Sequence, residues 1–331
     1  MLKITRSLIK HLNTKEGNLQ ATSLPLLINT ILRYGNKVDG NAIIESCLVN
    51  PYSHDMGLFA PIIEKWGDLS TAKQLAKCYI KNGELIDTDF TEVLELLGNL
   101  KYEPIKPLLI KHAFSEESDH YTSKNAVLGL LNFDCSDIQD ILLEQIENTY
   151  GKNLFHEYIP ALVCKISNRR AILEKLFELG DTTCSTDCNA GIILGFSLCP
   201  EGVTYFKKAI FNPDWEACSS ATGTIHATYQ GIKNLNISFS ELFADIQKLE
   251  GKSQKEGLEN LFDLLKIKID DLFPHAESFM ELHKDFFSFD GKSSLYSISD
   301  KTGLINTFYE TQKLIELKAS EELILRCQKE E

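Results

Sequence analysis

An apolar pattern recurs about every 33 residues between positions 20 and 246 of this 331-residue chain. One series of apolar residues follows this period: Ile31, Ile63, Leu96, Leu130, Leu162, Leu194 and Ala227. A second series runs about a dozen residues behind the first: Ala42, Leu75, Leu108, Ile141, Leu173, Phe206 and Phe239. Two interlocked series are typical of stacked helical hairpins, because each repeat covers the apolar face of its neighbour. The pattern therefore predicts an all-α chain of about seven helical hairpins.

Each predicted unit contains an apolar helix, a short break and a second apolar helix. Along the middle of the chain the predicted pairs are 90–100 with 104–114, 125–133 with 137–147, 155–166 with 168–179, and 189–198 with 201–211. The second helices show the spacing of an amphipathic helix, as at Ile138, Ile141 and Leu142. Gly180 is predicted to cap the helix before it. Signals for β-strands are nearly absent.

The period divides the chain into three parts. Residues 1–19 are predicted to form an N-terminal capping helix, residues 20–246 the repeat array, and residues 247–331 a C-terminal helical cap or small helical domain. In the last part we expect a polar hinge at 249–255, helices at 257–272, 277–287 and 303–328, and a loop at 288–302.

The repeats lack the fixed residues of two common helical families. The tryptophan and tyrosine pattern of tetratricopeptide repeats is missing, and so is the Thr-Pro-Leu-His turn of ankyrin repeats. What the first helices share is a Leu-Gly pair, as at Leu97-Gly98 and Leu194-Gly195, and again at the end of the segment 124–129. The array resembles the short HEAT-like repeats of the bacterial lyase-type class. The resemblance implies a right-handed α-α superhelix, that is, a HEAT-like solenoid with helical caps.

Composition excludes several classes of function. The chain has 43% apolar and 24% charged residues, a net charge of -13, and 34 basic residues of which five are arginines. This acidic, arginine-poor balance argues against nucleic-acid binding. No stretch has the ~20 consecutive apolar residues that span a membrane, and no signal peptide is recognisable. Nine scattered cysteines favour a reducing compartment, so we expect a cytoplasmic protein that does not bind membranes.

The search for catalytic and metal sites yields weak candidates. Cys184 and Cys188, with Cys199 further on, have an acceptable ligand spacing but no second ligand pair, and core packing explains them better. His54-Asp55 lies in a predicted loop, but adjacent side chains rarely face each other. No phosphate-binding or dinucleotide motif is present. We therefore expect no catalytic residue, no metal and no cofactor.

One distribution of charge does suggest a function. In HEAT-like arrays the second helices line the concave face, and here they carry many basic residues: Lys73, Lys77, Lys81, Lys106, Lys111, Arg169, Arg170, Lys175, Lys207 and Lys208. Lys73 and Lys106 are one period apart, as are Lys175 and Lys208, whereas residues 137–147 are acidic. This predicts a patchily basic groove for an acidic segment of a partner. The alternative is that these side chains only solvate exposed helix faces.

Aromatic residues near the same groove are candidate anchors, since interfaces favour tryptophan and tyrosine. They are Trp66, Tyr102, Tyr205 and Trp215. For both tryptophans, packing in the core is the alternative.

The sequence thus favours a non-enzymatic module that binds a protein partner along the concave face of a helical solenoid. A more specific alternative is an immunity protein or other inhibitor that neutralises a basic effector or toxin. Two further alternatives follow from the HEAT-like resemblance, which includes chromophore (bilin) lyases and DNA glycosylases. The net charge of -13 opposes the second of these.

Overall fold

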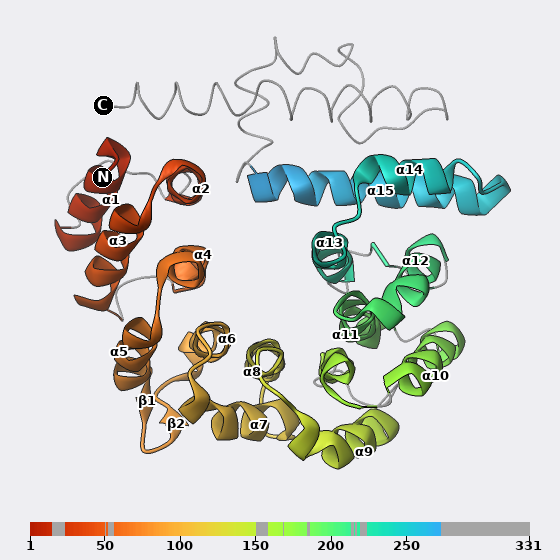
Figure 1. Cartoon of the computed structure of the whole chain (residues 1–331), viewed down its shortest axis with the longest axis horizontal. Coiled ribbons are helices and arrows are strands. Elements are labelled where there is room, and N and C mark those ends of the chain that lie inside the picture. Colours follow the sequence, from red (N-terminus) through yellow and green to blue (C-terminus); the bar gives the residue numbers. More distant parts are fainter. Residues whose placement is uncertain are drawn as a thin grey trace, which may run out of the picture. The chain divides into compact units, whose positions relative to one another are not determined.

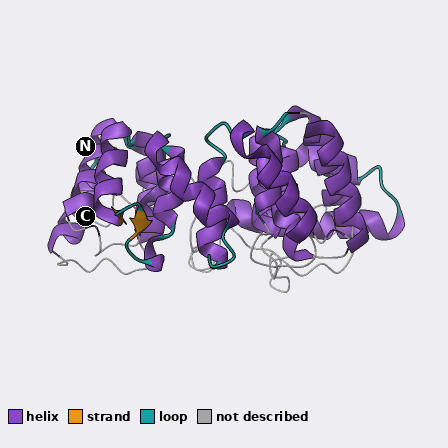
Figure 2. Ribbon diagram, turned by 90° about the horizontal axis from the view of Figure 1, so that it is seen from below, coloured by secondary structure: helices purple, strands orange, loops and turns teal. Residues whose placement is uncertain are grey.

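The computed structural model describes residues 1–14, 24–49, 51, 56–149, 158–167, 169–183, 186–212, 215, 217–218 and 224–272. In these ranges the chain forms the α-helices α1 to α15, several short 3-10 helices and one small β-hairpin (Figure 2). The predicted all-α class is confirmed for the described residues. None of their helices combines the length and the apolar character needed to cross a membrane.

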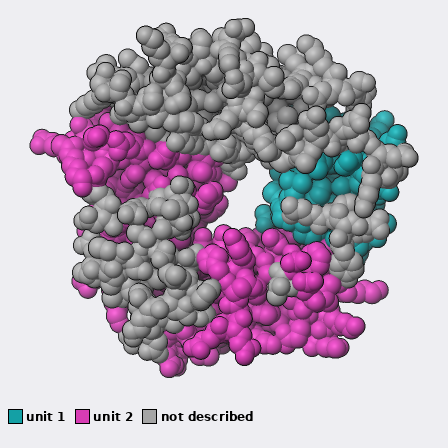
Figure 3. All heavy atoms as spheres, turned by 180° about the vertical axis from the view of Figure 1, so that it is seen from behind, with its two compact units in different colours: residues 1–74, 268–331 teal, residues 75–267 magenta. Residues whose placement is uncertain are grey.

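The chain divides into two compact units, which are coloured separately in Figure 3. Unit 1 comprises residues 1–74 and 268–331, and unit 2 comprises residues 75–267. The division into cap, array and C-terminal part rests on the repeat pattern and stays a prediction. The helices predicted at 277–287 and 303–328 and the loop at 288–302 lie outside the described residues.

Unit 1 begins with two helix pairs. Its helices are α1 (Lys3–Thr14), α2 (Leu24–Tyr34), α3 (Lys37–Val49) and α4 (Met56–Trp66), and α5 (Leu69–Tyr79) starts in unit 1 and ends in unit 2. Apolar side chains from all four helices form the core, among them Leu8, Ile31, Ile43 and Phe59. Each of these is at most 2% exposed, so the helices bury one continuous apolar face.

A buried carboxylate ties α1 to α3. Asp39 is 0% exposed, and its Oδ1 accepts hydrogen bonds from the backbone N–H of Leu2 and the hydroxyl of Thr5, both at 2.7 Å. Its Oδ2 accepts one from the backbone N–H of Asn36 at 3.1 Å. Burial by itself raises the pKa of this carboxyl, but the three hydrogen bonds outweigh it and hold the pKa below its ordinary value. Asp39 therefore stays charged inside unit 1.

Unit 2 continues the order of paired helices. After a hairpin of β1 (Ile80–Lys81) and β2 (Glu84–Leu85) come η3 (Thr88–Phe90), α6 (Glu92–Asn99), η4 (Glu103–Ile105), α7 (Lys106–Phe114), α8 (His120–Leu130), η5 (Ser136–Ile138) and α9 (Gln139–Thr149). The chain then forms η7 (Ile159–Lys165), α10 (Arg169–Thr183), α11 (Thr186–Ser197), η8 (Pro200–Gly202), α12 (Val203–Phe211), α13 (Thr224–Asn234), α14 (Phe239–Ile246) and α15 (Gly251–Leu272).

The apolar series of the sequence maps onto the core. All seven residues of the first series are at most 5% exposed. In the second series Ala42 is half-buried and Ile141 is 46% exposed, whereas the next residue, Leu142, is 0% exposed. The register predicted for α9 was therefore wrong by one residue, because either position satisfies the helical spacing.

Three predicted boundaries also need correction. The helix predicted at 155–166 is, where described, the 3-10 helix η7. Helix α10 continues through Gly180 to Thr183, so this glycine is not its cap. Helix α15 begins at Gly251, inside the expected hinge.

The β-hairpin was missed by the sequence analysis. Ile80 pairs with Leu85 and Lys81 with Glu84, and the two residues between them, Asn82 and Gly83, have φ of 53° and 79°. An Asn-Gly pair in this conformation is the preferred two-residue hairpin turn, so the pair could have predicted the hairpin from the sequence.

The paired helices of unit 2 form two rows. We call α6, α8, η7, α11 and α13 the first-helix row, and α7, α9, α10, α12 and α14 the second-helix row. Within unit 2, Figure 1 shows α6, α8, α11 and α13 on the inner side and α7, α9, α10 and α12 on the outer side. The first-helix row is tightly packed: a Cβ added to Gly98 would lie 2.4 Å from Cα of Gly129, so these two backbones touch.

Candidate functional site

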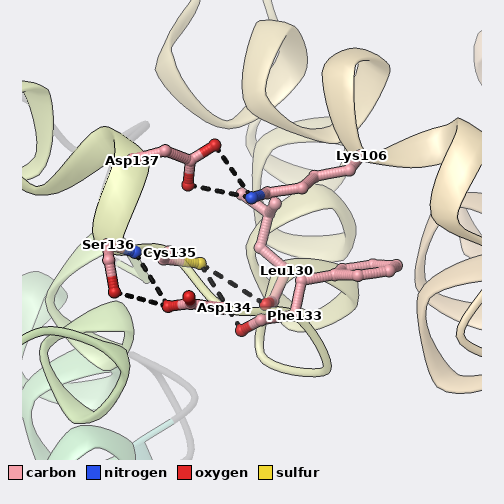
Figure 4. A network of polar contacts seen from close by, with 7 residues as sticks. All are labelled: Lys106, Leu130, Phe133, Asp134, Cys135, Ser136 and Asp137. Carbon is pink, nitrogen blue, oxygen red and sulfur yellow. Dashed lines mark hydrogen bonds and ion pairs between the residues drawn. The ribbon is translucent and has the colours of Figure 1, made fainter.

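A ladder of polar contacts joins neighbours in the second-helix row. At its start, Nζ of Lys106 on α7 donates to both carboxylate oxygens of Asp137, at 2.8 and 2.9 Å (Figure 4). Next, Oε1 of Gln139 on α9 accepts hydrogen bonds from the backbone N–H and the hydroxyl of Ser167, at 3.3 and 2.9 Å. Ser167 lies shortly before α10, so the first two steps connect α7, α9 and α10.

Two more contacts continue the ladder. Nε and Nη2 of Arg169 on α10 donate to the two oxygens of Glu201, at 3.1 and 3.0 Å. Nζ of Lys207 on α12 contacts Glu241 at 2.8 Å and Asp245 at 3.2 Å, both on α14. The ion pairs of Lys106 with Asp137, Arg169 with Glu201 and Lys207 with Glu241 join residues 31, 32 and 34 positions apart, close to the period of the sequence.

The pKa values of the ladder follow from this pairing. Hydrogen bonding to Glu201 raises the pKa of Arg169, and the same contact lowers the pKa of Glu201. Hydrogen bonding to Glu241 raises the pKa of Lys207. Burial lowers the pKa of Lys106, but its contact with Asp137 outweighs this and leaves the pKa raised. All three cations are therefore charged and engaged.

A turn before α9 positions Asp137 opposite Lys106. Figure 4 shows Oδ1 of Asp134 accepting from the backbone N–H and the hydroxyl of Ser136, at 3.0 and 2.6 Å. The thiol of Cys135 donates to the carbonyl oxygens of Leu130, the last residue of α8, and of Phe133, at 3.7 and 3.8 Å. Burial raises the pKa of Cys135 to about 11, so the group is a packed thiol and not a nucleophile.

The ladder and the hairpin pair some of the basic residues that were assigned to the predicted groove, which itself stays a prediction. Lys106, Arg169 and Lys207 pair with carboxylates of the next repeat, and Lys111 pairs with Glu84 of the hairpin. The remaining candidates are all exposed: Lys73, Lys77, Lys81, Arg170, Lys175 and Lys208. Lys73 lies in unit 1 and the others in unit 2. Some of the basic residues that recur with the period therefore connect one repeat to the next.

The face also differs from the one predicted. In unit 2 the second helices lie on the outer side, not on the inner side that the sequence analysis expected (Figure 1). The glycine contact between Gly98 and Gly129 lets the backbones of α6 and α8, two helices of the inner side, approach closely. The row that packs more closely lies on the inside of the bend.

The structure brings Trp215 together with Tyr205 and Lys208 of α12, and adds Phe177 of α10. Trp215 stacks on the ring of Phe177, with centroids 5.3 Å apart and planes at 20°. The ring centroid of Tyr205 lies 5.6 Å from that of Phe177, and Nζ of Lys208 also lies 5.6 Å from the Phe177 centroid. Phe177, Tyr205 and Lys208 are not buried, and we call them the α10–α12 patch. Phe177 was missed because it follows the ordinary apolar spacing of its helix.

The other aromatic candidates lie elsewhere. Trp215 is 0% exposed and packs on Phe196 beneath the patch, so it is a core residue and not an exposed anchor. Trp66, in unit 1, is half-buried over Gly40 with the ammonium of Lys65 4.7 Å from its ring centroid. Tyr102 is half-buried between α6 and η4.

The titratable groups of the described residues show no assembled catalytic centre. His112 is half-buried, Nδ1 lies 3.3 Å from the hydroxyl of Ser118, and burial lowers its pKa. Burial raises the pKa of both Cys47 and Cys164 to about 12. No group of three or more His, Cys, Asp or Glu in the described part could hold a metal. Cys184 and His54-Asp55 lie outside that part.

Comparison with known proteins identifies no relative: no protein-family model, no curated protein and no solved structure matches this chain.

Proposed function

We propose that this protein is a non-enzymatic helical-repeat module that binds another protein through the α10–α12 patch. The observation that carries the proposal is the accessibility of this patch. The rings of Phe177 and Tyr205 are half-buried, and the exposed Lys208 places its ammonium over the Phe177 ring. Large aromatic surfaces with a nearby cation are enriched at protein interfaces.

The proposed architecture is a HEAT-like solenoid, a right-handed α-α superhelix of about seven helix pairs. Two observations support it. The first apolar series is buried at every position, and hydrogen bonds recur between residues one period apart, as between Asn132 and Asn99, 33 positions apart. Another such bond joins Asn125 to Thr91, 34 positions apart.

The chemistry of the patch suggests what the partner presents. An apolar side chain would pack on the half-buried rings, and a carboxylate would pair with Lys208. We propose that this occurs in the cytoplasm. The described cysteines, Cys47 among them, are free thiols, which fits a reducing compartment.

The test places a photo-crosslinking amino acid at Thr204, which is exposed beside Tyr205, in the full chain inside its native cell. A partner captured there should lose about tenfold or more in affinity with Tyr205→Ser combined with Lys208→Glu. Lys73→Glu is the matched control, because Lys73 is exposed but lies outside the patch. Equal affinity of the double variant and the wild type would refute the proposal.

A second candidate is a protein that neutralises a basic effector. Exposed carboxylates in the segments before α6 and α8 favour it: Asp87, Asp89, Glu116, Glu117 and Asp119. A crosslinker at Glu116 distinguishes the two candidates. Capture of one basic protein from Glu116, with none from Thr204, would favour neutralisation.

A further inference from the structure

The two rows of unit 2 are held together by contacts of different kinds. In the first-helix row, Gly98 meets Gly129, and a Cβ added to Gly195 would lie 3.0 Å from the carbonyl oxygen of Pro160. Such separations are fixed by hard-sphere contact between backbones. They do not depend on charge, so salt leaves them unchanged.

In the second-helix row long polar side chains connect neighbouring helices, and between α10 and α12 the ring of Phe177 also lies 5.6 Å from that of Tyr205. Three junctions of the ladder are ionic: Lys106 with Asp137, Arg169 with Glu201, and Lys207 with Glu241. The cationic side chains are 20%, 33% and 30% exposed, respectively, so water and ions reach them. Among the described contacts of the ladder, the one between α9 and α10 is neutral, because it joins Gln139 to Ser167.

We infer that the ion pairs of the second-helix row break with rising ionic strength, so that the helices they join move apart. The backbone contacts of the first-helix row stay in place during this movement. The Debye length falls from about 10 Å at 0.1 M salt to about 3 Å at 1 M, which weakens accessible ion pairs. Loss of these ion pairs increases the separation of α7 from α9 and of α10 from α12. The neutral junction between α9 and α10 keeps its separation. The spacing of the outer helices thus responds to the ionic environment, one junction at a time.

The inference can be tested with spin labels on unnatural amino acids in the full chain, which avoids the native cysteines. Pro107, Asp140, Ala171 and Thr204 are exposed and lie on α7, α9, α10 and α12. Labels at 107 and 140 report the first ionic junction, labels at 140 and 171 the neutral junction, and labels at 171 and 204 the second ionic junction. Distance distributions are measured at low and at high concentrations of sodium chloride.

We expect the two ionic junctions to lengthen by roughly 1–2 Å and to broaden at high salt, an amplitude typical of shifts between packed helices. The neutral junction should not change. At low salt, Lys106→Met and Asp137→Asn should each reproduce the high-salt distribution at the first junction. Lys111→Met is the control, since it removes a lysine from the same helix without touching the ladder.

Two results would overturn the inference. One is an equal response of all three junctions, which would indicate general loosening of unit 2. The other is an unchanged distribution at the first junction for both ladder variants while their helical content matches the wild type.

Discussion

The two rows of helices in unit 2 solve the same problem by different means. Neighbours in the first-helix row approach until glycine backbones touch, as Gly98 and Gly129 do. Neighbours in the second-helix row are connected by lysine, arginine and glutamine side chains that reach the next repeat. The inner row tolerates almost no change in side-chain volume, whereas the outer row depends on reach and charge.

This difference changes how the basic residues should be interpreted. Lys106 and Lys207 recur with the period because each repeat needs a contact to its neighbour, and not because a partner reads them as a series. The residues left for a partner lie beside the ladder, at the α10–α12 patch. A periodic charge is therefore weaker evidence for a binding groove than an exposed aromatic residue that packing does not require.

The largest expected effect breaks the inner row. Gly98→Ala places a methyl group 2.4 Å from a backbone atom of Gly129, so a helix must move, and we expect a loss of about 3 kcal/mol in the free energy of unfolding. Gly257→Ala is the control, because the nearest atoms to its methyl group belong to the Ile246 side chain, at 3.2 Å, and not to a backbone. That variant should remain within about 1 kcal/mol of wild type, since alanine favours a helix. Chemical denaturation measures both, and equal losses would contradict the close packing of the inner row.

The next effect compares a buried with an exposed carboxylate. Asp39→Asn replaces the two carboxylate oxygens by one amide oxygen and one N–H₂ group, which face the donors of Leu2, Thr5 and Asn36. We expect this to lower the free energy of unfolding by about 2 kcal/mol at neutral pH. Glu201→Gln, on the ladder, should cost much less than Asp39→Asn, because its contact with Arg169 is exposed.

The lowered pKa of Asp39 also predicts that the free energy of unfolding depends on pH. The folded pKa of Asp39 lies below its ordinary value of 3.8. At a pH between the folded and the unfolded pKa, the unfolded chain therefore binds more protons than the folded chain. The stabilisation is complete above the unfolded pKa and is lost as the pH falls through the folded pKa. Between about pH 5 and pH 3, the free energy of unfolding should therefore fall less steeply with decreasing pH for Asp39→Asn than for wild type. A slope equal to that of wild type would remove the assigned role.

The smallest effect concerns a single ladder contact. A double-mutant cycle of Arg169→Met and Glu201→Met should give a small favourable coupling energy at low salt. At high salt the coupling should approach zero, because screening acts on exposed charges. The cycle is measured by denaturation at two salt concentrations. A coupling that does not depend on salt would indicate that packing, and not charge, joins these repeats.

The sequence predicted the core better than the surface. The first apolar series is buried throughout because burial requires only an apolar side chain at the correct spacing. At α9 two adjacent apolar residues satisfied that spacing, and the sequence could not choose between Ile141 and Leu142. The hairpin at Asn82-Gly83 had a recognisable turn signal, but two residues per strand are too short for an alternating pattern.

For the candidate site, Tyr205, Lys208 and Trp215 were selected from sequence, but their roles were not. Trp215 is covered and Tyr205 is half-buried although both are large aromatic residues. Phe177 completes the patch from another helix, and only packing shows that it adjoins Lys208. Sequence spacing tells which residues share a helix face, but not which faces of different helices meet.

By itself, the sequence determined the all-α class, the paired helices and the residues of the inner core, because these follow from apolar spacing along one chain. The tertiary structure decided which row lies inside unit 2, which cations are paired and which aromatic rings stay accessible. Those properties depend on how closely neighbouring backbones approach. That approach is set by contacts such as Gly98 with Gly129, between residues 31 positions apart in the sequence.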